Sequence, residues 1–180
     1  MAVDVELELT YLARELPEGL AGSPSKIITD VYFPEQLAHP TLRLRQNGDS
    51  YEMTKKVIAE GTDSSHQLEH TIKLDQAEFD ALAHAPGKRV TKRRYYYPYQ
   101  GLTAEIDVFE GGLKGLVEVD FEFTDRDTQL AFKMPDFCLA DVTQEAFAAG
   151  GMLAGKSYKD IEKHLAKYGY KPLSIGQGRV

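Results

Sequence analysis

The sequence predicts a mainly β (α+β) protein in which about eight antiparallel strands form a sheet that closes on itself into a barrel. Apolar and polar residues alternate with a period of two in segment after segment up to residue 123, as in strands with one buried face. The connections between these segments are mostly short and rich in turn-forming residues. Many short-looped strands in succession favour a closed antiparallel barrel. From Asp125 onward the apolar spacing becomes helical, which predicts flanking helices and a helical C-terminal segment.

The first half of the chain contains four of the predicted strands. In the first of them, valines and leucines alternate with Asp4, Glu6, Glu8 and Thr10, so one face of the strand is acidic. A stretch rich in Pro, Gly and Ser predicts a loop before the second strand. The third and fourth strands form a hairpin through the turn residues Asn-Gly-Asp at 47–49. The predicted ranges of these strands are 3–10, 27–33, 41–46 and 51–57.

The second half of the predicted barrel begins after a Gly-Thr-Asp-Ser-Ser loop. Asp75 is in position to cap a short helix that carries Phe79 and Leu82. A long β-branched and aromatic run follows, and we expect Pro98 to end it, because proline cannot donate a backbone hydrogen bond. The strands predicted here are 68–73, 88–97, 103–109 and 116–123.

Helices are predicted near 125–133, 143–154 and 157–168. The sequence shows no second domain and no internal repeat. We therefore expect a single domain over 1–180, with the barrel core at about 3–123 and the C-terminal helices at about 125–168.

Composition excludes several classes of protein. The formal net charge of −7 argues against bulk binding of nucleic acid or of an anionic membrane, so an anionic ligand needs a local site. The acidic N-terminus is unlike a signal peptide, and no stretch has the ~20 apolar residues of a membrane span. The single cysteine, Cys138, rules out a disulfide framework within the chain. We expect a cytoplasmic protein without membrane attachment.

The predicted strands sort their charges by sign. Acidic residues lie on 3–10, 103–109 and 116–123, and basic residues on 41–46 and 88–94. A polar face on any one of these strands is explained if that face is exposed to water. Solvent-exposed surfaces, however, more often carry positive and negative residues intermixed. If these faces point into a barrel, its lumen has an acidic wall suited to Mg²⁺ or Mn²⁺ and a basic wall suited to a polyanion. The acidic cluster is Glu6, Glu8, Asp120 and Glu122, and the basic residues are Arg43, Arg45, Lys56, Lys92 and Arg94.

These motifs resemble the CYTH superfamily, the triphosphate tunnel metalloenzymes, over residues 3 to about 155. The resemblance is carried by six elements in order, of which each alone is weak. They are Glu6-Leu-Glu8, Leu42-Arg43-Leu44-Arg45, Met53-Thr-Lys-Lys56, Lys92-Arg-Arg94-Tyr95, Glu105-Ile-Asp107-Val-Phe109-x-Gly-x-Leu113 and Val119-Asp120-Phe-Glu122-Phe123.

The resemblance implies an eight-stranded tunnel in which carboxylates hold a divalent metal and basic residues hold a triphosphate. It implies metal binding by Glu6, Glu8, Asp120 and Glu122, and phosphate binding by Arg43, Arg45, Lys56, Lys92 and Arg94. Among these, Glu6, Glu8, Lys56 and Arg94 are the expected catalytic residues, and Glu69, Lys73, Glu105 and Asp107 are additional candidates. The implied activity is metal-dependent hydrolysis of a small triphosphate compound, and inorganic triphosphate is the first candidate for the substrate. The implied partner is a small triphosphate or polyphosphate, with a homodimer as one expected assembly.

Several positions depart from the pattern of the family. Thr10 stands where the signature Glu-x-Glu-x-Lys has lysine, and Ser65 and Gln67 replace an arginine and a carboxylate. Asp120 is one methylene shorter than the usual glutamate. These departures favour an alternative, a triphosphate- or polyphosphate-binding module with impaired catalysis. Adenylyl cyclase and thiamine triphosphatase activities, known in the same family, are further alternatives.

One more motif has a simpler explanation. Residues 150–157 match the Walker A pattern, but a P-loop must follow a buried parallel strand. Residues 141–149 read as helical instead, so we expect a joint of small residues between two C-terminal helices.

Overall fold

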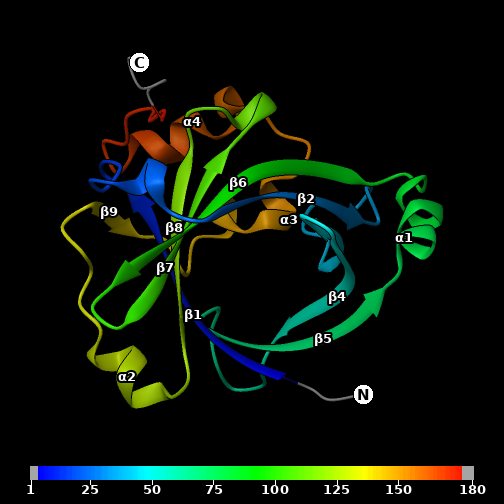
Figure 1. Ribbon diagram of the computed structural model, residues 1–180, viewed down its shortest axis with the longest axis horizontal. Helices are drawn as coiled ribbons and strands as arrows, with labels where there is room; N and C mark the ends of the chain where they lie inside the picture. The colour runs from blue at the N-terminus through cyan, green and yellow to red at the C-terminus, as the bar shows by residue number, and fades with distance from the viewer. Residues whose placement is uncertain (1–3, 176–180) are drawn as a thin grey trace.

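The computed structural model describes residues 4–175 and shows a closed antiparallel barrel of eight strands (Figure 1). Each strand bonds to the next around the ring, and the ring closes because the first strand bonds to partners on both sides. Around the ring the strands are β5 (His66–Leu74), β4 (Ser50–Ile58), β3 (Leu42–Asn47), β2 (Ser25–Phe33), β6 (Lys88–Tyr99), β7 (Leu102–Phe109), β8 (Val117–Phe123) and β1 (Asp4–Ala13). The predicted fold class is confirmed.

The strand β1 closes the barrel with its two halves. Its first half pairs with β5, with Glu6 opposite Gln67, and its second half pairs with β8, with Glu8 opposite Glu122. Successive side chains of a strand point to opposite faces, so this register sends the even-numbered residues of β1 inward. The inner face of the barrel therefore receives the acidic residues of β1.

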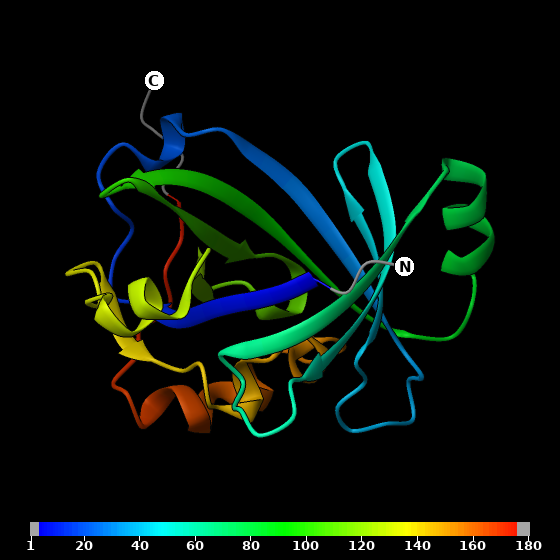
Figure 2. The same cartoon turned by 90° about the horizontal axis from the view of Figure 1, so that it is seen from below.

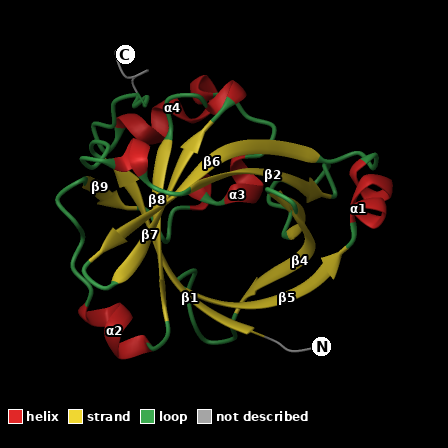
Figure 3. Ribbon diagram, viewed as in Figure 1, coloured by secondary structure: helices red, strands yellow, loops and turns green. Residues whose placement is uncertain are grey.

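Helices and short segments cover parts of the outer wall and one end of the barrel (Figures 2 and 3). The helix α1 (Gln76–Ala83) packs Phe79 over Val31 and Leu44, and α2 (Arg126–Ala131) leads to Phe132, which packs on Phe121. The remaining elements are η1 (Leu20–Gly22), η2 (Gly111–Leu113), β9 (Cys138–Asp141), η3 (Ala146–Ala148), α3 (Gly150–Leu153) and α4 (Tyr158–Ala166). No helix between residues 4 and 175 is long and apolar enough to span a bilayer.

The C-terminal elements close one end of the barrel. Tyr32, Val90 and Phe109 belong to the same buried apolar cluster as Phe147 of η3 and Leu153 of α3. Tyr32, Val90 and Phe109 also line the cavity inside the barrel. The inner face is thus apolar where it meets the C-terminal segment. The charged side chains line the rest of the lumen, away from this segment.

The C-terminal helix predicted at 143–154 is wrong. Residues 138–141 form β9, which pairs with β1, and they are followed by η3 and by α3, a helix of four residues. The backbone of Val142 donates to the carbonyl oxygen of Thr10, so this segment continues along β1 rather than coiling. The helices at 126–131 and 158–166 agree with the prediction, as does the helix that Asp75 caps.

Pro98 does not end its strand. It lies in β6 opposite Thr103, one residue before the strand finishes at Tyr99. A proline is tolerated there because it stands beside the hairpin turn, where a missing ladder bond costs little.

The Walker A match is a joint of small residues, as predicted. A methyl group at Gly150 would lie 2.3 Å from the Tyr32 hydroxyl oxygen, and one at Gly151 would lie 2.2 Å from the Pro40 carbonyl oxygen. These glycines allow α3 to lie against the end of the barrel. Ser157 caps α4 with Asp160, so it is not in a phosphate-binding loop.

Candidate functional site

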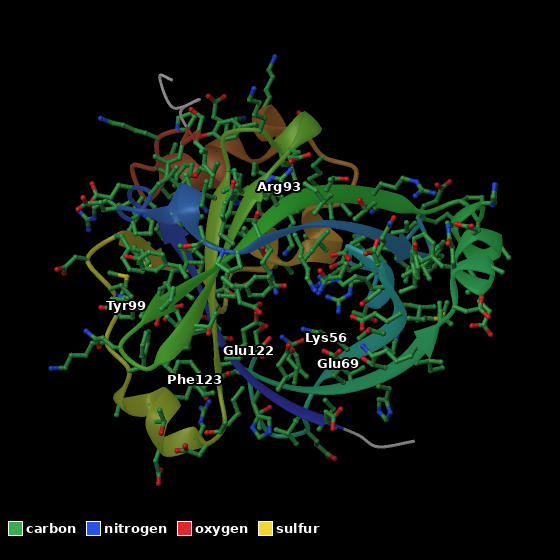
Figure 4. The ribbon with its side chains drawn as sticks, viewed as in Figure 1. Lys56, Glu69, Arg93, Tyr99, Glu122 and Phe123 are labelled. Atoms are coloured by element: carbon green, nitrogen blue, oxygen red, sulfur yellow. The ribbon has the colours of Figure 1, made fainter. Side chains whose placement is uncertain are left out.

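The barrel encloses a cavity of about 790 Å³. Its walls are the inner faces of all eight barrel strands together with residues 142–151. Figure 4 shows Lys56, Glu69 and Glu122 directed into this enclosed space from opposite sides. A space of this size, bounded by a rigid sheet, is large enough for a small ligand.

Carboxylates gather on three adjacent strands of the ring, which are β7, β8 and β1. Glu8 lies directly opposite Glu122, and Asp120 lies opposite both Thr10 and Glu105. Like charges directly opposite one another on the same face repel. The predicted acidic wall is therefore present as a contiguous patch of the lumen, formed by Glu6, Glu8, Glu105, Asp120 and Glu122.

The carboxylates of this wall hold protons more tightly than free side chains do. Burial, together with the charges of Glu8 and Asp107, raises the pKa of Asp120 to about 7. Partial desolvation and the charges of Glu105, Glu6 and Glu8 raise the pKa of Glu122 to about 7. Burial also raises the pKa values of Glu8 and Glu105. Burial is the main cause of each shift, and repulsion between neighbouring carboxylates adds to it.

Two of the predicted phosphate-binding arginines are bound by carboxylates of the chain. Arg45 donates to both oxygens of Asp30, at 2.7 and 2.8 Å. Arg94 donates to Asp107, Asp120 and Glu105, and Lys92 donates to Asp107. Burial alone would raise the pKa of Asp107, but Arg94 and Lys92 lower it to about 2. Burial likewise opposes ionisation of Asp30, and Arg45 holds its pKa well below the usual range.

Lys56 connects the basic and acidic walls. Its Nζ donates to Oε2 of Glu6 at 2.5 Å and lies 3.4 Å from Glu69 and 4.0 Å from Glu8. Burial alone would lower the pKa of Lys56, but the charges of Glu8 and Glu6 raise it above its ordinary value. The predicted candidate Glu69 therefore belongs to the lumen as a partner of this lysine.

Arg43 has a donor that is buried without a partner within residues 4–175. It is 8% exposed, it lines the cavity, and its Nε has no hydrogen-bond partner among the described residues. A buried donor without a partner costs about 1–3 kcal/mol unless a ligand or water accepts from it. Arg43 is thus prepared to bind an anion.

Lys73, an additional candidate, does not join the cavity wall. Its ammonium bonds to Glu52 at 2.6 Å, and its side chain is 77% exposed. The strand β5 ends one residue later, at Leu74, so Lys73 lies near the end of the barrel wall.

The three departing residues each have a specific environment. Thr10 donates its hydroxyl proton to Asp120 at 2.9 Å. Ser65 bonds to Asp63 and accepts from Arg126, and Gln67 donates to the carbonyl oxygen of Ser64. None of the three brings a charge into the lumen.

Sequence reasoning missed Asp30 and Glu118. Asp30 is 2% exposed and orients Arg45, and the signal for it was a lone acid in an otherwise apolar strand. Glu118 is 4% exposed, and its Oε1 has no partner among the described residues. Burial and the charge of Asp120 raise the pKa of Glu118 well above its usual value. The sequence signal for Glu118 was its position two residues before Asp120, on the same face of the same strand.

Gln129 of α2 was also missed, because it lies outside the barrel strands. It is 3% exposed and donates to the carbonyl oxygens of Glu8 and Ser65, at 3.1 and 2.9 Å. Arg126 donates to the side-chain oxygen of Gln129 and to Ser65. The helix α2 therefore fixes β1 beside the acidic wall to the loop that precedes β5.

Comparison with known proteins gives matches over most of the chain. Residues 5–143 match the CYTH domain family. An inorganic triphosphatase of Nitrosomonas europaea is 35% identical over 143 residues, which are 78% of this chain and 90% of that protein. An inorganic triphosphatase of Acetivibrio thermocellus is 28% identical over 125 residues, 68% of this chain and 77% of that protein.

The barrel also matches solved structures. A crystal structure of an inorganic triphosphatase superposes with a TM-score of 0.60 at 29% identity, over 84% of this chain and 95% of that one. The crystal structure of a putative adenylate cyclase from Bacillus halodurans gives a TM-score of 0.56 at 14% identity, over 99% of this chain and 97% of that one. At that identity the second match concerns the fold alone.

Proposed function

Because this chain belongs to the CYTH family, we propose that it hydrolyses inorganic triphosphate inside its barrel with Mg²⁺ or Mn²⁺ as cofactor. The observation that carries the proposal is the lumen itself, which has a carboxylate wall facing a basic wall across an enclosed space. Relatives named inorganic triphosphatase, at 35% and 28% identity, support this choice of substrate.

The residues of the acidic wall fit a hard divalent cation. Carboxylate oxygens are the preferred ligands of Mg²⁺ and Mn²⁺, and the neighbouring strands β1 and β8 bring several of them to one part of the lumen. No group of three metal-ligating side chains within 4–175 is already drawn together around one point, so the carboxylates must turn toward the ion as it binds. Glu6, Glu8, Asp120 and Glu122 are the proposed ligands. The chemistry that a bound divalent cation supplies is charge neutralisation at the phosphate oxygens and activation of the attacking water.

The basic residues of the lumen hold and neutralise the triphosphate in this proposal. Arg43 offers its free Nε to a phosphate oxygen. Arg45 is kept in place by Asp30 and Arg94 by Asp107, so both guanidinium groups lie at fixed positions in the lumen wall. Charge that is fixed before the reaction stabilises the charge that develops during phosphoryl transfer. The enclosed space also limits the access of bulk water.

A binding module with impaired catalysis is the second candidate. The observation that favours it is the set of neutral side chains at Thr10, Ser65 and Gln67, each of which is bound to other groups of the chain. Such a protein would still hold triphosphate through Arg43. Thiamine triphosphatase activity is an alternative that the same assay detects, whereas adenylyl cyclase activity releases pyrophosphate from ATP and is detected when inorganic pyrophosphatase is added.

The test measures phosphate release from inorganic triphosphate, thiamine triphosphate and ATP, each with Mg²⁺, with Mn²⁺ and with EDTA. We expect release from inorganic triphosphate with a divalent cation, and loss of at least 10²-fold in a variant with Glu6→Gln and Glu8→Gln. Activity in EDTA, or full activity of the double variant, would contradict the proposal.

Binding without turnover would instead select the second candidate. In that case inorganic triphosphate should raise the melting temperature of the wild type and much less that of Arg43→Ala. Arg93→Ala is the matched control, because Arg93 lies next to Arg94 on β6 and does not line the cavity (Figure 4).

A further inference from the structure

Lys56 is bound by the carboxylates that the proposed cation requires. Its ammonium lies 2.5 Å from Glu6, 3.4 Å from Glu69 and 4.0 Å from Glu8, and its side chain is 23% exposed. A divalent cation on Glu6 and Glu8 would compete with this ammonium for the same oxygens. Two cations cannot occupy one carboxylate oxygen at contact distance without strong repulsion.

Lys56 also lies beside Arg43, whose buried Nε has no partner among the described residues. Arg43 is directly opposite Thr54 in the hairpin of β3 and β4, and Lys56 follows Thr54 by two residues on the same inner face. Diagonal neighbours of this kind lie within reach of long side chains. An anion that accepts from Arg43 is therefore within reach of the Lys56 ammonium once that ammonium leaves Glu6.

The other paired cations are held differently. Arg45 makes a two-point contact with Asp30, and Arg94 makes one with Asp107, and both aspartates are at most 2% exposed. Leaving such a buried carboxylate without its partner costs several kcal/mol, so these pairs are fixed. Lys56, in contrast, has one hydrogen bond shorter than 3 Å, and its acceptor, Glu6, lies in the cavity wall.

We propose that Lys56 is an exchange group that couples cation binding to polyanion binding: a divalent cation on Glu6 and Glu8 releases its ammonium, which then binds the triphosphate beside Arg43. The inference rests on the proposed function, because it needs both ligands in this lumen. Coupling of this kind is reciprocal, so either ligand strengthens the binding of the other. The favourable coupling through Lys56 is additional to any direct contact between the cation and the phosphates.

The test replaces the carboxylate that holds the lysine and measures polyanion binding without metal. By calorimetry in EDTA, Glu6→Gln should bind inorganic tripolyphosphate about tenfold more tightly than the wild type, because Lys56 is already free. Glu52→Gln is the matched control. It also removes one cavity-lining carboxylate that bonds to a lysine, but that lysine is the exposed Lys73, so the gain should stay below about threefold.

A second readout follows Lys56 itself. Acetylation with a limiting reagent, read by mass spectrometry, should become several-fold faster at Lys56 when Mg²⁺ alone is added, because the released ammonium loses its proton more readily. Acetylation of Lys73 should not change.

The outcomes separate this inference from the proposed function. If the wild type binds Mg²⁺ and tripolyphosphate but Glu6→Gln gains no more than Glu52→Gln, the exchange is wrong and the proposed function stands. If the wild type binds neither ligand, both fall together. Circular dichroism of each variant establishes that the barrel is intact.

Discussion

The buried aspartates of this barrel differ in pKa according to the cations beside them. Asp30 with Arg45, and Asp107 with Arg94, form tight buried pairs in which the aspartates ionise more readily than in water. Asp120 has a single contact with Arg94, at 3.1 Å, so burial and the charges of Glu8 and Asp107 raise its pKa instead. The difference between neighbouring aspartates thus follows from the number of close contacts that each makes with cations, since Asp107 has Arg94 and Lys92 and Asp120 has a single contact with Arg94.

At the scale of one residue, Thr10→Lys should increase the turnover of inorganic triphosphate. Thr10 contacts Asp120 at 2.9 Å, so a lysine at this position places its ammonium against the acidic wall, near the expected phosphates. A positioned cation of this kind contributes roughly 10²- to 10³-fold in rate. Steady-state phosphate release measures the effect, and Thr10→Val is the control for loss of the hydroxyl alone. A slower Thr10→Lys variant would mean that Lys56 or another cation already supplies this charge.

The residues of the site differ in how far the sequence could predict them. The inward direction of Glu6, Glu8 and Arg43 follows from alternation, because a strand with one apolar face must turn its other side chains away from it. The ion pairs could not be predicted, since they depend on which strands become neighbours in the ring. Asp30 reaches Arg45 only because β2 bonds to β3 in this register.

At the scale of elements, the strands were predictable and the C-terminal segment was not. Period-two alternation is strong in strands whose outer face is covered, such as β8 with Val117, Val119 and Phe121. Residues 142–154 have a helical composition, but Val142 and Thr143 bond to Thr10 of β1 and the rest of the segment covers the end of the barrel. Tertiary contacts override local preference in so short a segment.

The joint before α4 provides a prediction about packing. Gly151→Ala should lower the free energy of unfolding by about 1–3 kcal/mol, because its methyl group would lie 2.2 Å from the Pro40 carbonyl oxygen. Denaturant titration measures this change. Gly22→Ala is the matched control, since a methyl group there meets no atom within 4 Å. Equal stability of the two variants would show that α3 does not lie against residue 40.

At the scale of the molecule, the acidic wall makes stability depend on pH. Asp120 and Glu122 have folded-state pKa values of about 7, above those of an unfolded chain, so the folded protein binds more protons between about pH 4 and 7. Stability should therefore fall as the pH rises through this window, by about 3 kcal/mol between pH 5 and 8 from Asp120 alone, and Glu122 adds less because its exposed side chain is screened by water. Asp107 acts oppositely, since its stabilisation is lost as the pH falls toward its pKa of about 2.

Urea titrations at pH 5, 6, 7 and 8 measure this dependence. Asp120→Asn should flatten the slope, because it removes one of the carboxyl groups whose pKa is raised in the folded protein. Mg²⁺ should raise the stability at pH 8 more than at pH 5, since protons compete with the cation for the same oxygens. A wild-type stability that rises from pH 5 to 8 would mean that these carboxylates are well solvated.

The double pairing of β1 also constrains the order in which this protein can fold. A strand near the start of the chain bonds to residues 66–69 on one side and 118–123 on the other, so the contacts that close the ring are distant in sequence. High contact order of this kind slows folding, because loop closure precedes the gain from pairing. During synthesis, β1 leaves the ribosome first and must wait for β8 before the ring can form. Until then the open edges of β1 and β7 are exposed to pairing with other chains.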